Sequence, residues 1–492
     1  MKKGLITIAL LLVVVIATVS VRTNSVFEER QPVVNKDDLN GIVQKTQSIS
    51  EAAATRLSQS IQIKTISYDD RQKFDTGEFK RFHQLLEDSY PTIHQVAKKT
   101  VINGYSLVYH VKGTDSSLKP ALFLNHMDVV PVDPNTLDKW THGPYSGDIK
   151  NGVVWGRGAL DDKGGVMALM EGLELYLKDN NKPKRDIYLA FGHDEEVGGS
   201  EGAGKIAKYF ADNKIQFEFA LDEGGAVMDG ILDGYNRPVA MVGIAEKGYV
   251  NIHLTVKGEG GHSSKPPAQT AVGILSQAIA NVEQNQFPAT MDFLGITFDH
   301  IGNHGSWPIR MVMSNLWLFG FVVEEEFLAD PEMAASLRTT IAPTMLQGSP
   351  KSNALAQVAK GVINIRIMPG ETYDTVKQHI ETAINDPRVE VTLSAQSNPP
   401  PISSDESEAY KLLADTIVQT DDNALVAPYM VQAATDSKYY PSVSDNVYRF
   451  LMIRLNKDNF KQMHGVNEQI AVEDYTKLIE FYYRMIHGAG KM

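Results

Sequence analysis

The chain has 492 residues with 60 acidic and 47 basic side chains, a formal net charge of −13 and no cysteine. Its 43% hydrophobic and 22% charged content is that of a globular protein, which excludes a disordered chain, a collagen and a polytopic membrane protein. The acidic balance argues against nucleic acid as a partner, because phosphate binding needs clustered lysines and arginines. Without cysteine, any metal must be held by His, Asp and Glu.

The N-terminus begins with two lysines, Lys2 and Lys3, and an uncharged stretch over residues 4–21. This arrangement is typical of export, and the length lies between a signal peptide's apolar region and a short membrane span. No clean cleavage site follows. We therefore expect residues 1–24 to be an uncleaved membrane anchor rather than a cleaved signal, followed by a linker over residues 25–49. The body is expected to be extracytoplasmic, either periplasmic or at the cell surface.

From about residue 50, short apolar strands alternate with amphipathic helices. Strands are predicted at 120–125, 186–191 and 217–221, and helices at 164–178 and 203–213. This alternation predicts an α/β catalytic domain with a mainly parallel sheet covered by helices.

The pattern changes at about residue 248. The predicted order there is strand 250–256, helix 271–283, strand 361–367, helix 372–384 and strand 389–393. This order fits a smaller α+β, ferredoxin-like domain if one further strand lies between these elements. The stretch from 291 to 350 shows no simple pattern, because Pro331 and Pro343 interrupt it.

Three consecutive prolines at 399–401 mark a return to the first domain. The small domain is therefore predicted to be inserted in the larger one. The expected boundaries are 50–247 and 399–492 for the two parts of the catalytic domain, and 248–398 for the insertion.

Acidic or histidine side chains follow predicted strands at four places. They are His126 with Asp128, Asp161–Asp162, Asp194–Glu195–Glu196 and Asp222–Glu223. In an open α/β sheet, ligands bind at the carboxyl ends of the strands. Carboxylates gathered at one edge would repel one another, so a cation is the natural compensation. Histidine and carboxylates without sulfur form a ligand set for zinc, manganese or cobalt.

Each group also has an ordinary explanation. A single His126 is more often structural, Asp161 could cap the next helix, and Glu195 with Glu196 could lie in a solvated loop. Their coincidence at successive strand ends favours a metal site.

The local spacings fit roles in such a site. His126 and Asp128 face the same way in an extended chain, so Asp128 can hold the second imidazole nitrogen. Of the adjacent Glu195 and Glu196, one can bind the metal while the other takes a proton from metal-bound water.

Six segments carry a resemblance to a known family. They are NHMDVVPVD (125–133), GRGALDDKGGVMALM (156–170), GHDEEVGG (192–199), LDEGG (221–225), GHSSKPP (261–267) and FKQMHGVNE (460–468). They resemble the M20 family of metallopeptidases, and within it the carboxypeptidase S and PM20D1-like N-acyl-amino-acid hydrolase branch. The resemblance runs from about residue 50 to the C-terminus. It implies a hydrolase with two zinc ions per chain, or cobalt or manganese, that cleaves peptides with a free C-terminal carboxylate or N-acyl amino acids.

The resemblance also implies roles for individual residues. The matched metal ligands are His126, Asp161, Glu196, Asp222 and His464, with Asp161 bridging both ions. Asp128 matches the residue that orients the first histidine, and Glu195 matches the general base. The family is not uniform about Asp222 and Glu223, and we choose Asp222. The Asp161–Asp162 peptide bond is expected to be cis.

By the same resemblance, the inserted domain is a lid and often a dimerisation domain, so a homodimer is expected. His262 matches a lid histidine that stabilises the oxyanion, commonly in the partner subunit's site. Asn353 and Arg366 resemble lid residues that bind substrate, and Arg366 would pair with the substrate carboxylate in a fork.

Two other functions fit parts of the sequence. Residues 198–202 match the G-x-S-x-G nucleophile elbow of serine hydrolases at Ser200, but the elbow needs its serine at the strand-to-helix turn, and the apolar strand stops near Phe191. The second alternative is a non-catalytic exported protein that binds peptides or acyl amino acids, because two lobes could capture such a ligand. Such a protein has no need of Glu195 beside Glu196.

Overall fold

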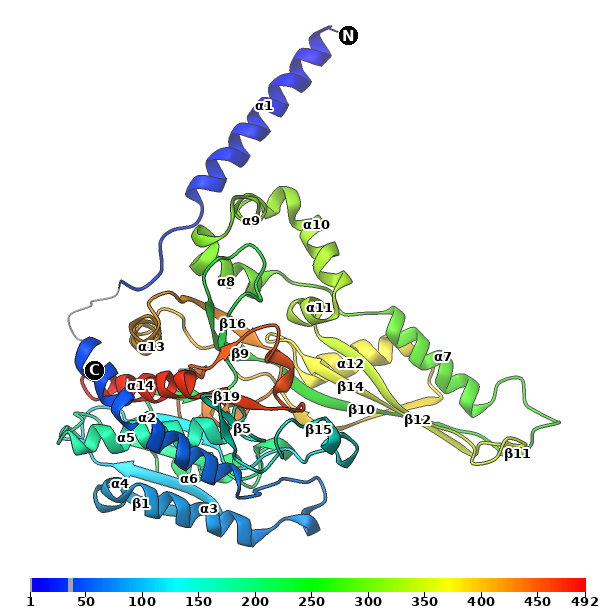
Figure 1. Cartoon of the computed structure of the whole chain (residues 1–492). Helices are drawn as coiled ribbons and strands as arrows, with labels where there is room; N and C mark the ends of the chain where they lie inside the picture. Colours follow the sequence, from blue (N-terminus) through cyan, green and yellow to red (C-terminus); the bar gives the residue numbers. More distant parts are fainter. Residues whose placement is uncertain (1, 34–38) are drawn as a thin grey trace.

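A computed structural model describes residues 2–33 and 39–492. Figure 1 shows a body with a large helix-covered sheet, a smaller domain extending to one side, and the N-terminal helix α1 (Lys2–Ser25) projecting from the body. The chain enters the small domain once and returns from it.

The large sheet has ten strands. Its order is β1 (Lys98–Ile102), β2 (Ser106–Val111), β6 (Ile187–Gly192), β3 (Ala121–His126), β7 (Phe219–Asp222), β17 (Val447–Arg449), β9 (Val239–Glu246), β8 (Val227–Met228) and β18 (Arg454–Leu455), and β16 (Leu425–Val431) also pairs with β9. The central strands β6, β3, β7 and β17 are parallel. The β1, β2 and β6 pairings and those of β9 with β8 and β17 are antiparallel, so the sheet is parallel at its centre and mixed overall.

Helices cover both faces of this sheet because its central strands are apolar on both sides. Phe123 of β3 packs into the core that contains α2 (Leu39–Ile61), α5 (Lys163–Lys178), α13 (Glu408–Thr420) and α14 (Val472–Ala489). Leu122, the preceding residue, packs on the opposite face against α6 (Ala203–Asp212). This alternation confirms the predicted α/β class.

Helix α2 begins within the range expected to be a linker. Its inward positions Ile42, Ile49, Ala53 and Leu57 follow helical spacing and pack into the main core. The predicted linker over residues 25–49 is therefore too long, because this amphipathic stripe starts well before residue 50. Smaller elements complete the domain: α3 (Thr76–Ser89), α4 (Pro91–Val96), and a sheet of β19 (Gln469–Ala471), β5 (Val153–Trp155) and β4 (Ile149–Lys150).

The small domain has a four-stranded antiparallel sheet. Its order is β12 (Thr340–Gln347), β14 (Val358–Ile367), β10 (Gly248–Lys257) and β15 (Val389–Ser397), with helices α7 (Ala271–Gln284) and α12 (Tyr373–Ile384). The chain order β-α-β-β-α-β is that of the ferredoxin-like fold. The strand missing from the sequence pattern is β12, where Pro343 is tolerated because it lies at a register shift on an edge strand.

Four helices lie between α7 and β12 in the chain: α8 (Asp292–Ile301), α9 (Trp307–Met313), α10 (Leu316–Ala329) and α11 (Pro331–Leu337). They do not extend the small sheet. The Thr297 hydroxyl of α8 donates to the Pro428 carbonyl of β16 at 2.7 Å, so α8 packs on the large domain. Pro331 starts α11 at a position where its missing N–H costs nothing, and Asp330 caps the helix.

Candidate active site

The parallel strands at the centre of the large sheet end at the same edge. His126 is the last residue of β3 and is paired with Gly192, the last residue of β6. Asp222 ends β7, which pairs with β3 on the other side. The loops that follow these strands therefore begin side by side, as expected for a ligand site in an α/β sheet.

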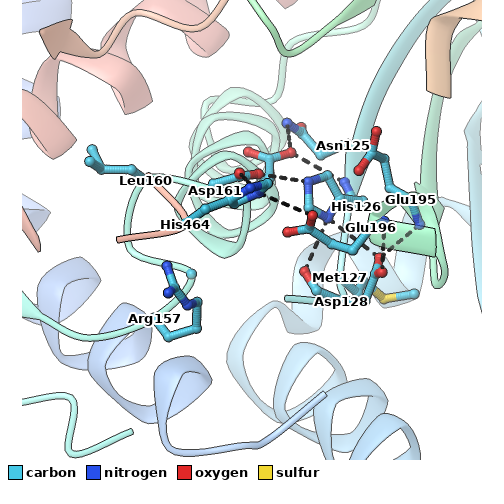
Figure 2. A network of polar contacts seen from close by, with 12 residues as sticks. Asn125, His126, Met127, Asp128, Arg157, Leu160, Asp161, Glu195, Glu196 and His464 are labelled. Atoms are coloured by element: carbon cyan, nitrogen blue, oxygen red, sulfur yellow. Dashed lines mark hydrogen bonds and ion pairs between the residues drawn. The ribbon is translucent and has the colours of Figure 1, made fainter. Parts of the chain in front are cut away.

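Four of the predicted side chains meet at this edge. The His126 Nε2 atom lies 2.9 Å from Asp161 Oδ1, and the His464 Nε2 atom lies 3.0 Å from Asp161 Oδ2 and 3.1 Å from Glu196 Oε2. Figure 2 shows these side chains pointing toward one another. Ligand atoms of His126, Asp161 and Glu196 all lie within 4.8 Å of one another, a spacing that could hold a metal ion.

Asp128 connects the first histidine to the glutamate pair. Its two carboxylate oxygens accept the backbone N–H groups of Glu195 at 3.2 Å and Glu196 at 3.1 Å. The His126 Nδ1 atom lies 3.0 Å from the Asp128 carbonyl oxygen and 3.4 Å from its carboxylate. One fully buried side chain thus fixes both the imidazole and the loop that carries the glutamates.

The loop before Asp161 is held by a residue from the C-terminal part of the chain. Glu468 Oε1 accepts the backbone N–H groups of Gly158 at 3.0 Å, Leu160 at 2.8 Å and Asp161 at 3.1 Å. Its other oxygen pairs with Arg157 Nη1 at 2.5 Å, and both side chains are buried. These contacts orient Asp161, whose peptide bond to Asp162 is cis as the family resemblance implied.

Asp162 supports the end of β3. It accepts hydrogen bonds from the Asn125 side-chain amide at 2.7 Å and from the His126 backbone N–H at 3.2 Å, and the Tyr482 hydroxyl donates to Asn125. Burial raises the pKa of Asp162 to about 8. A Cβ at Gly165 would lie 2.1 Å from an Asp162 oxygen, so the first turn of α5 needs glycine there.

The carboxyl groups of the cluster raise one another's pKa. Burial raises the pKa of Glu195 well above its usual value, and Asp436, Glu223 and Glu196 add to the effect while His126 opposes it. Burial would also raise the pKa of Asp161, but hydrogen bonds with the two histidines outweigh it and hold that pKa low. A cluster of this kind is stabilised by positive charge.

Two buried carboxylate oxygens indicate where a positively charged ion could bind. Glu196 Oε1 and Asp222 Oδ2 are buried and accept no hydrogen bond within the described part of the chain. Such acceptors are rare in proteins unless an ion or water completes them. The donor set of imidazole nitrogens and carboxylate oxygens therefore fits a divalent transition metal.

Comparison with known proteins agrees with this chemistry. Residues 122–488 match the peptidase family M20/M25/M40. The chain belongs to the M20 family. It is 39% identical to a Dictyostelium discoideum protein described as probable carboxypeptidase S-like 2, which covers 98% of this chain and 93% of its own length.

Two further M20 relatives differ in their described activities. Identity is 32% to the Homo sapiens N-fatty-acyl-amino acid synthase/hydrolase PM20D1, over 88% of this chain and 87% of that protein. The sequence identity to carboxypeptidase S of Saccharomyces cerevisiae is 30%, over 88% of this chain and 83% of that protein. The fold is shared with the M20 metallo-carboxypeptidase Sso-CP2 from Sulfolobus solfataricus, with a TM-score of 0.66, 17% identity, and coverage of 89% of this chain and 99% of that chain. The protein is accordingly a hydrolase of the metallopeptidase and carboxypeptidase type.

The choice between Asp222 and Glu223 stays a prediction for this M20 site. Burial raises the pKa of Asp222 to about 6, and the pKa of Glu223 is also raised, by burial first and then by Asp161 and Asp222. Both carboxylates therefore lie within electrostatic reach of the cluster. Asp222 is the more buried of the two and has the unpartnered oxygen.

Two of the three lid residues, His262 and Asn353, lie away from the M20 cluster within one chain. His262 lies in the short strand β11 (Gly261–His262), is exposed, and has Ser264 Oγ 2.7 Å from its Nδ1. Figure 1 places β11 at the far tip of the small domain. Asn353 is exposed nearby, where its carbonyl accepts the Ser263 N–H, and Arg366 of β14 lies over the Tyr249 ring at 4.8 Å.

Ser200 lacks the setting of a nucleophile elbow. Strand β6 ends at Gly192, and the 3-10 turn Glu195–Val197 follows before Ser200. Ser200 is exposed and precedes α6 rather than directly following the strand. The serine-hydrolase alternative therefore has no support from the local geometry.

Sequence reasoning did not assign a role to Glu468. It stands four residues after His464 in a segment that was recognised, but nothing in its spacing indicates that it reaches residues 157–161. The available signal was weak: a carboxylate beside a candidate ligand and a distant arginine, Arg157, beside another. Only the folded chain shows that the two pair.

Proposed function

We propose that the protein is a two-metal amidohydrolase that cleaves the amide bond of peptides with a free C-terminal carboxylate or of N-acyl amino acids. The observation that carries the proposal is the convergence of His126, Asp161, Glu196 and His464, with Glu195 held beside them by Asp128. The similarity to both carboxypeptidase S and PM20D1 supports the same bond class.

His126, Asp161, Glu196, Asp222 and His464 would together hold the two ions. Zinc is the metal we propose, with cobalt or manganese as substitutes. When bound, the ions would lower the pKa of water and polarise the scissile carbonyl.

Glu195 is proposed as the general base. It lies next to Glu196, and the Asp128 carboxylate fixes its backbone N–H. Burial raises the pKa of Glu195, which makes it a stronger proton acceptor than a solvated glutamate. It would take a proton from the attacking water and pass it to the leaving amine.

The lid residues are proposed to complete the site from a second copy or by lid movement. His262 would stabilise the oxyanion as part of the partner in a homodimer, and Asn353 and Arg366 would bind the substrate. The exposed position of His262 at the tip of the small domain supports this arrangement, because it faces no group of its own catalytic cluster.

We also propose that α1 anchors the protein in a membrane, with the body extracytoplasmic. One described helix is long and apolar enough to cross a membrane, over Ile6–Ser25, with mean hydropathy 2.3. A signal sequence has the same properties, so a cleaved form is the alternative outcome.

The test is hydrolysis by the full chain, purified in mild detergent and loaded with zinc. The kcat/KM for Cbz-Gly-Phe is compared with that for N-oleoyl-phenylalanine, before and after treatment with a chelator. Turnover of either substrate that is lost with the metal and restored by zinc supports the proposal. Preference for the dipeptide would indicate a carboxypeptidase, and preference for the acyl chain an acyl-amino-acid hydrolase.

Two outcomes would contradict the proposal. Substrate binding without turnover in metal-loaded protein would favour the exported binding protein. Turnover that is unchanged by a chelator but is blocked by a fluorophosphonate would favour a serine hydrolase at Ser200.

A further inference from the structure

The helices α9 and α10 carry a group of exposed apolar side chains. Trp307, Trp317, Phe321 and Val322 are exposed by 59%, 56%, 71% and 49%, and we call them the α9–α10 patch. Trp317 and Phe321 are four residues apart and share one face of α10. Large aromatic side chains exposed on two successive helices are typical of an interaction surface.

The helices that carry the patch, α9 and α10, lie near the foot of α1 (Figure 1). The Arg22 Nε atom donates to the Ser314 carbonyl at 3.0 Å, and the Arg310 Nη2 atom donates to the Thr23 carbonyl at 3.2 Å. Thr23 is 3% exposed. The last turns of α1 are therefore fixed to the junction between α9 and α10, and the two parts cannot move independently.

The rest of α1 is apolar and largely exposed. Only 6% of its most apolar window is buried, and Leu10, Leu11 and Val13 are each 61% exposed. Twenty helical residues span about 30 Å, the thickness of a bilayer's hydrocarbon core. If α1 spans a bilayer, its end at Arg22 to Ser25 lies at the membrane surface, and the attached patch lies at the same level.

The composition of α10 fits shallow insertion. Its first two turns are apolar, and three exposed glutamates, Glu324 to Glu326, follow. Tryptophan is the side chain most typical of the membrane–water interface. The acidic stretch favours a surface rich in zwitterionic lipid over an anionic one.

We propose that the α9–α10 patch is a second membrane contact, which lies in the headgroup region of the bilayer that α1 crosses. It rests on the proposed anchoring role of α1, and not on the hydrolytic activity. Two contacts fix the tilt and rotation of the body, whereas a single helix would leave it free to turn. A second copy of the chain is the competing occupant of the patch.

The experiment uses tryptophan fluorescence of the full chain in phosphatidylcholine vesicles. The chain has four tryptophans, of which Trp140 is 9% exposed and Trp155 is half-buried in the large domain. Lipids brominated near the headgroup should quench part of the wild-type emission. The double variant W307F/W317F should lose this quenching, because only the two tryptophans of the large domain remain.

A matched pair of variants tests the contact itself. F321E should lower the quenching of Trp317, because a charge in the patch lifts α10 from the lipid. M333E on α11, where the side chain is 43% exposed outside the patch, should leave quenching unchanged.

Separate outcomes overturn the two proposals. If the chain does not float with vesicles after a carbonate wash, α1 is not an anchor. If it floats and brominated lipid quenches the wild type no more than W307F/W317F, the patch does not touch the membrane. Tryptophan emission that changes with protein concentration in detergent but is not quenched by brominated lipid would show that a second copy of the chain covers the patch. That result would overturn the proposal.

Discussion

The predicted functional residues at the catalytic edge, where the central parallel strands end, differ from those of the small domain in burial and in bonding partners. At the catalytic edge, His126 and Asp128 are buried and Asp161 is partly buried, and all three are bonded to groups from distant parts of the chain. In the small domain, His262 and Asn353 are exposed, and their contacts, with Ser264 and Ser263, stay within the tip of that domain. The groups proposed to hold the metals and move the proton are thus preorganised in one chain, while those proposed to stabilise the oxyanion and bind the substrate depend on a second copy or on lid movement.

The largest expected effect is at the catalytic edge, in Glu195→Gln. We expect kcat to fall about 10²- to 10⁴-fold, because the amide has no proton affinity to replace the carboxylate. Metal content, measured by mass spectrometry of the dialysed protein, should stay unchanged. Glu201→Gln, on the same loop but paired with Lys205 at the surface, is the control and should keep wild-type kcat. Loss of metal in Glu195→Gln would mean that Glu195 is a ligand.

Removal of the Glu468 charge tests how rigid the edge is. Glu468→Gln breaks a buried pair with Arg157 and weakens three backbone contacts, so we expect a loss of about 3–5 kcal/mol in the free energy of unfolding. The urea midpoint measures it. Asp212→Asn breaks an exposed pair with Lys208 and should cost at most about 1 kcal/mol. Equal losses in the two variants would contradict the claim of a preorganised edge.

The variant His262→Ala tests the role proposed for the exposed lid histidine. We expect kcat to fall about 10²-fold through loss of one oxyanion donor, with no change in stability because the side chain is exposed. If His262 acts in the partner's site, mixing this variant with Glu195→Gln should restore part of the activity. An additive, inactive mixture would mean that His262 serves its own chain.

The smallest effect is expected at the junction of the two domains. Lys247 is buried, its ammonium donates to the Arg338 carbonyl at 2.7 Å, and burial lowers its pKa from 10.5 to about 8. Below pH 8 the folded state carries a buried charge that the unfolded state carries in water. Between pH 8 and 10.5 the unfolded state binds more protons, so the unfolding free energy rises with pH.

Lys247→Met should therefore be more stable than the wild type below pH 8, by on the order of 1–2 kcal/mol since the hydrogen bond offsets part of the cost. The difference should disappear by about pH 10.5. Urea unfolding across this pH range measures it, and a constant difference would show that Lys247 does not titrate there.

The sequence was most informative where local pattern and chemistry agree. The strand before His126 and the helix after Asp162 follow from apolar periodicity, and the ligand types follow from four acidic or histidine groups at strand ends. These features are local, so one sequence suffices. The ferredoxin-like order of the small domain could also be predicted from local pattern, except for the edge strand β12, which Pro343 interrupts.

Long-range contacts could not be predicted in the same way. Arg157 and Glu468 are 311 positions apart, and no periodic pattern in the local sequence predicts their pairing. The helices α8 to α11 were missed because Pro331 resembles a break, although it begins a helix. Their packing against the large domain depends on contacts such as Thr297 to Pro428, which only the fold reveals.

The dependence of the Asp161 loop on Glu468 has a consequence for the newly made chain. His464 and Glu468 lie close to the C-terminus, and β19 and α14 must then pair and pack with β5 and α5. A chain still emerging from the ribosome lacks these residues at first. Such a chain cannot assemble the cluster, and truncation before residue 464 would give a product without it.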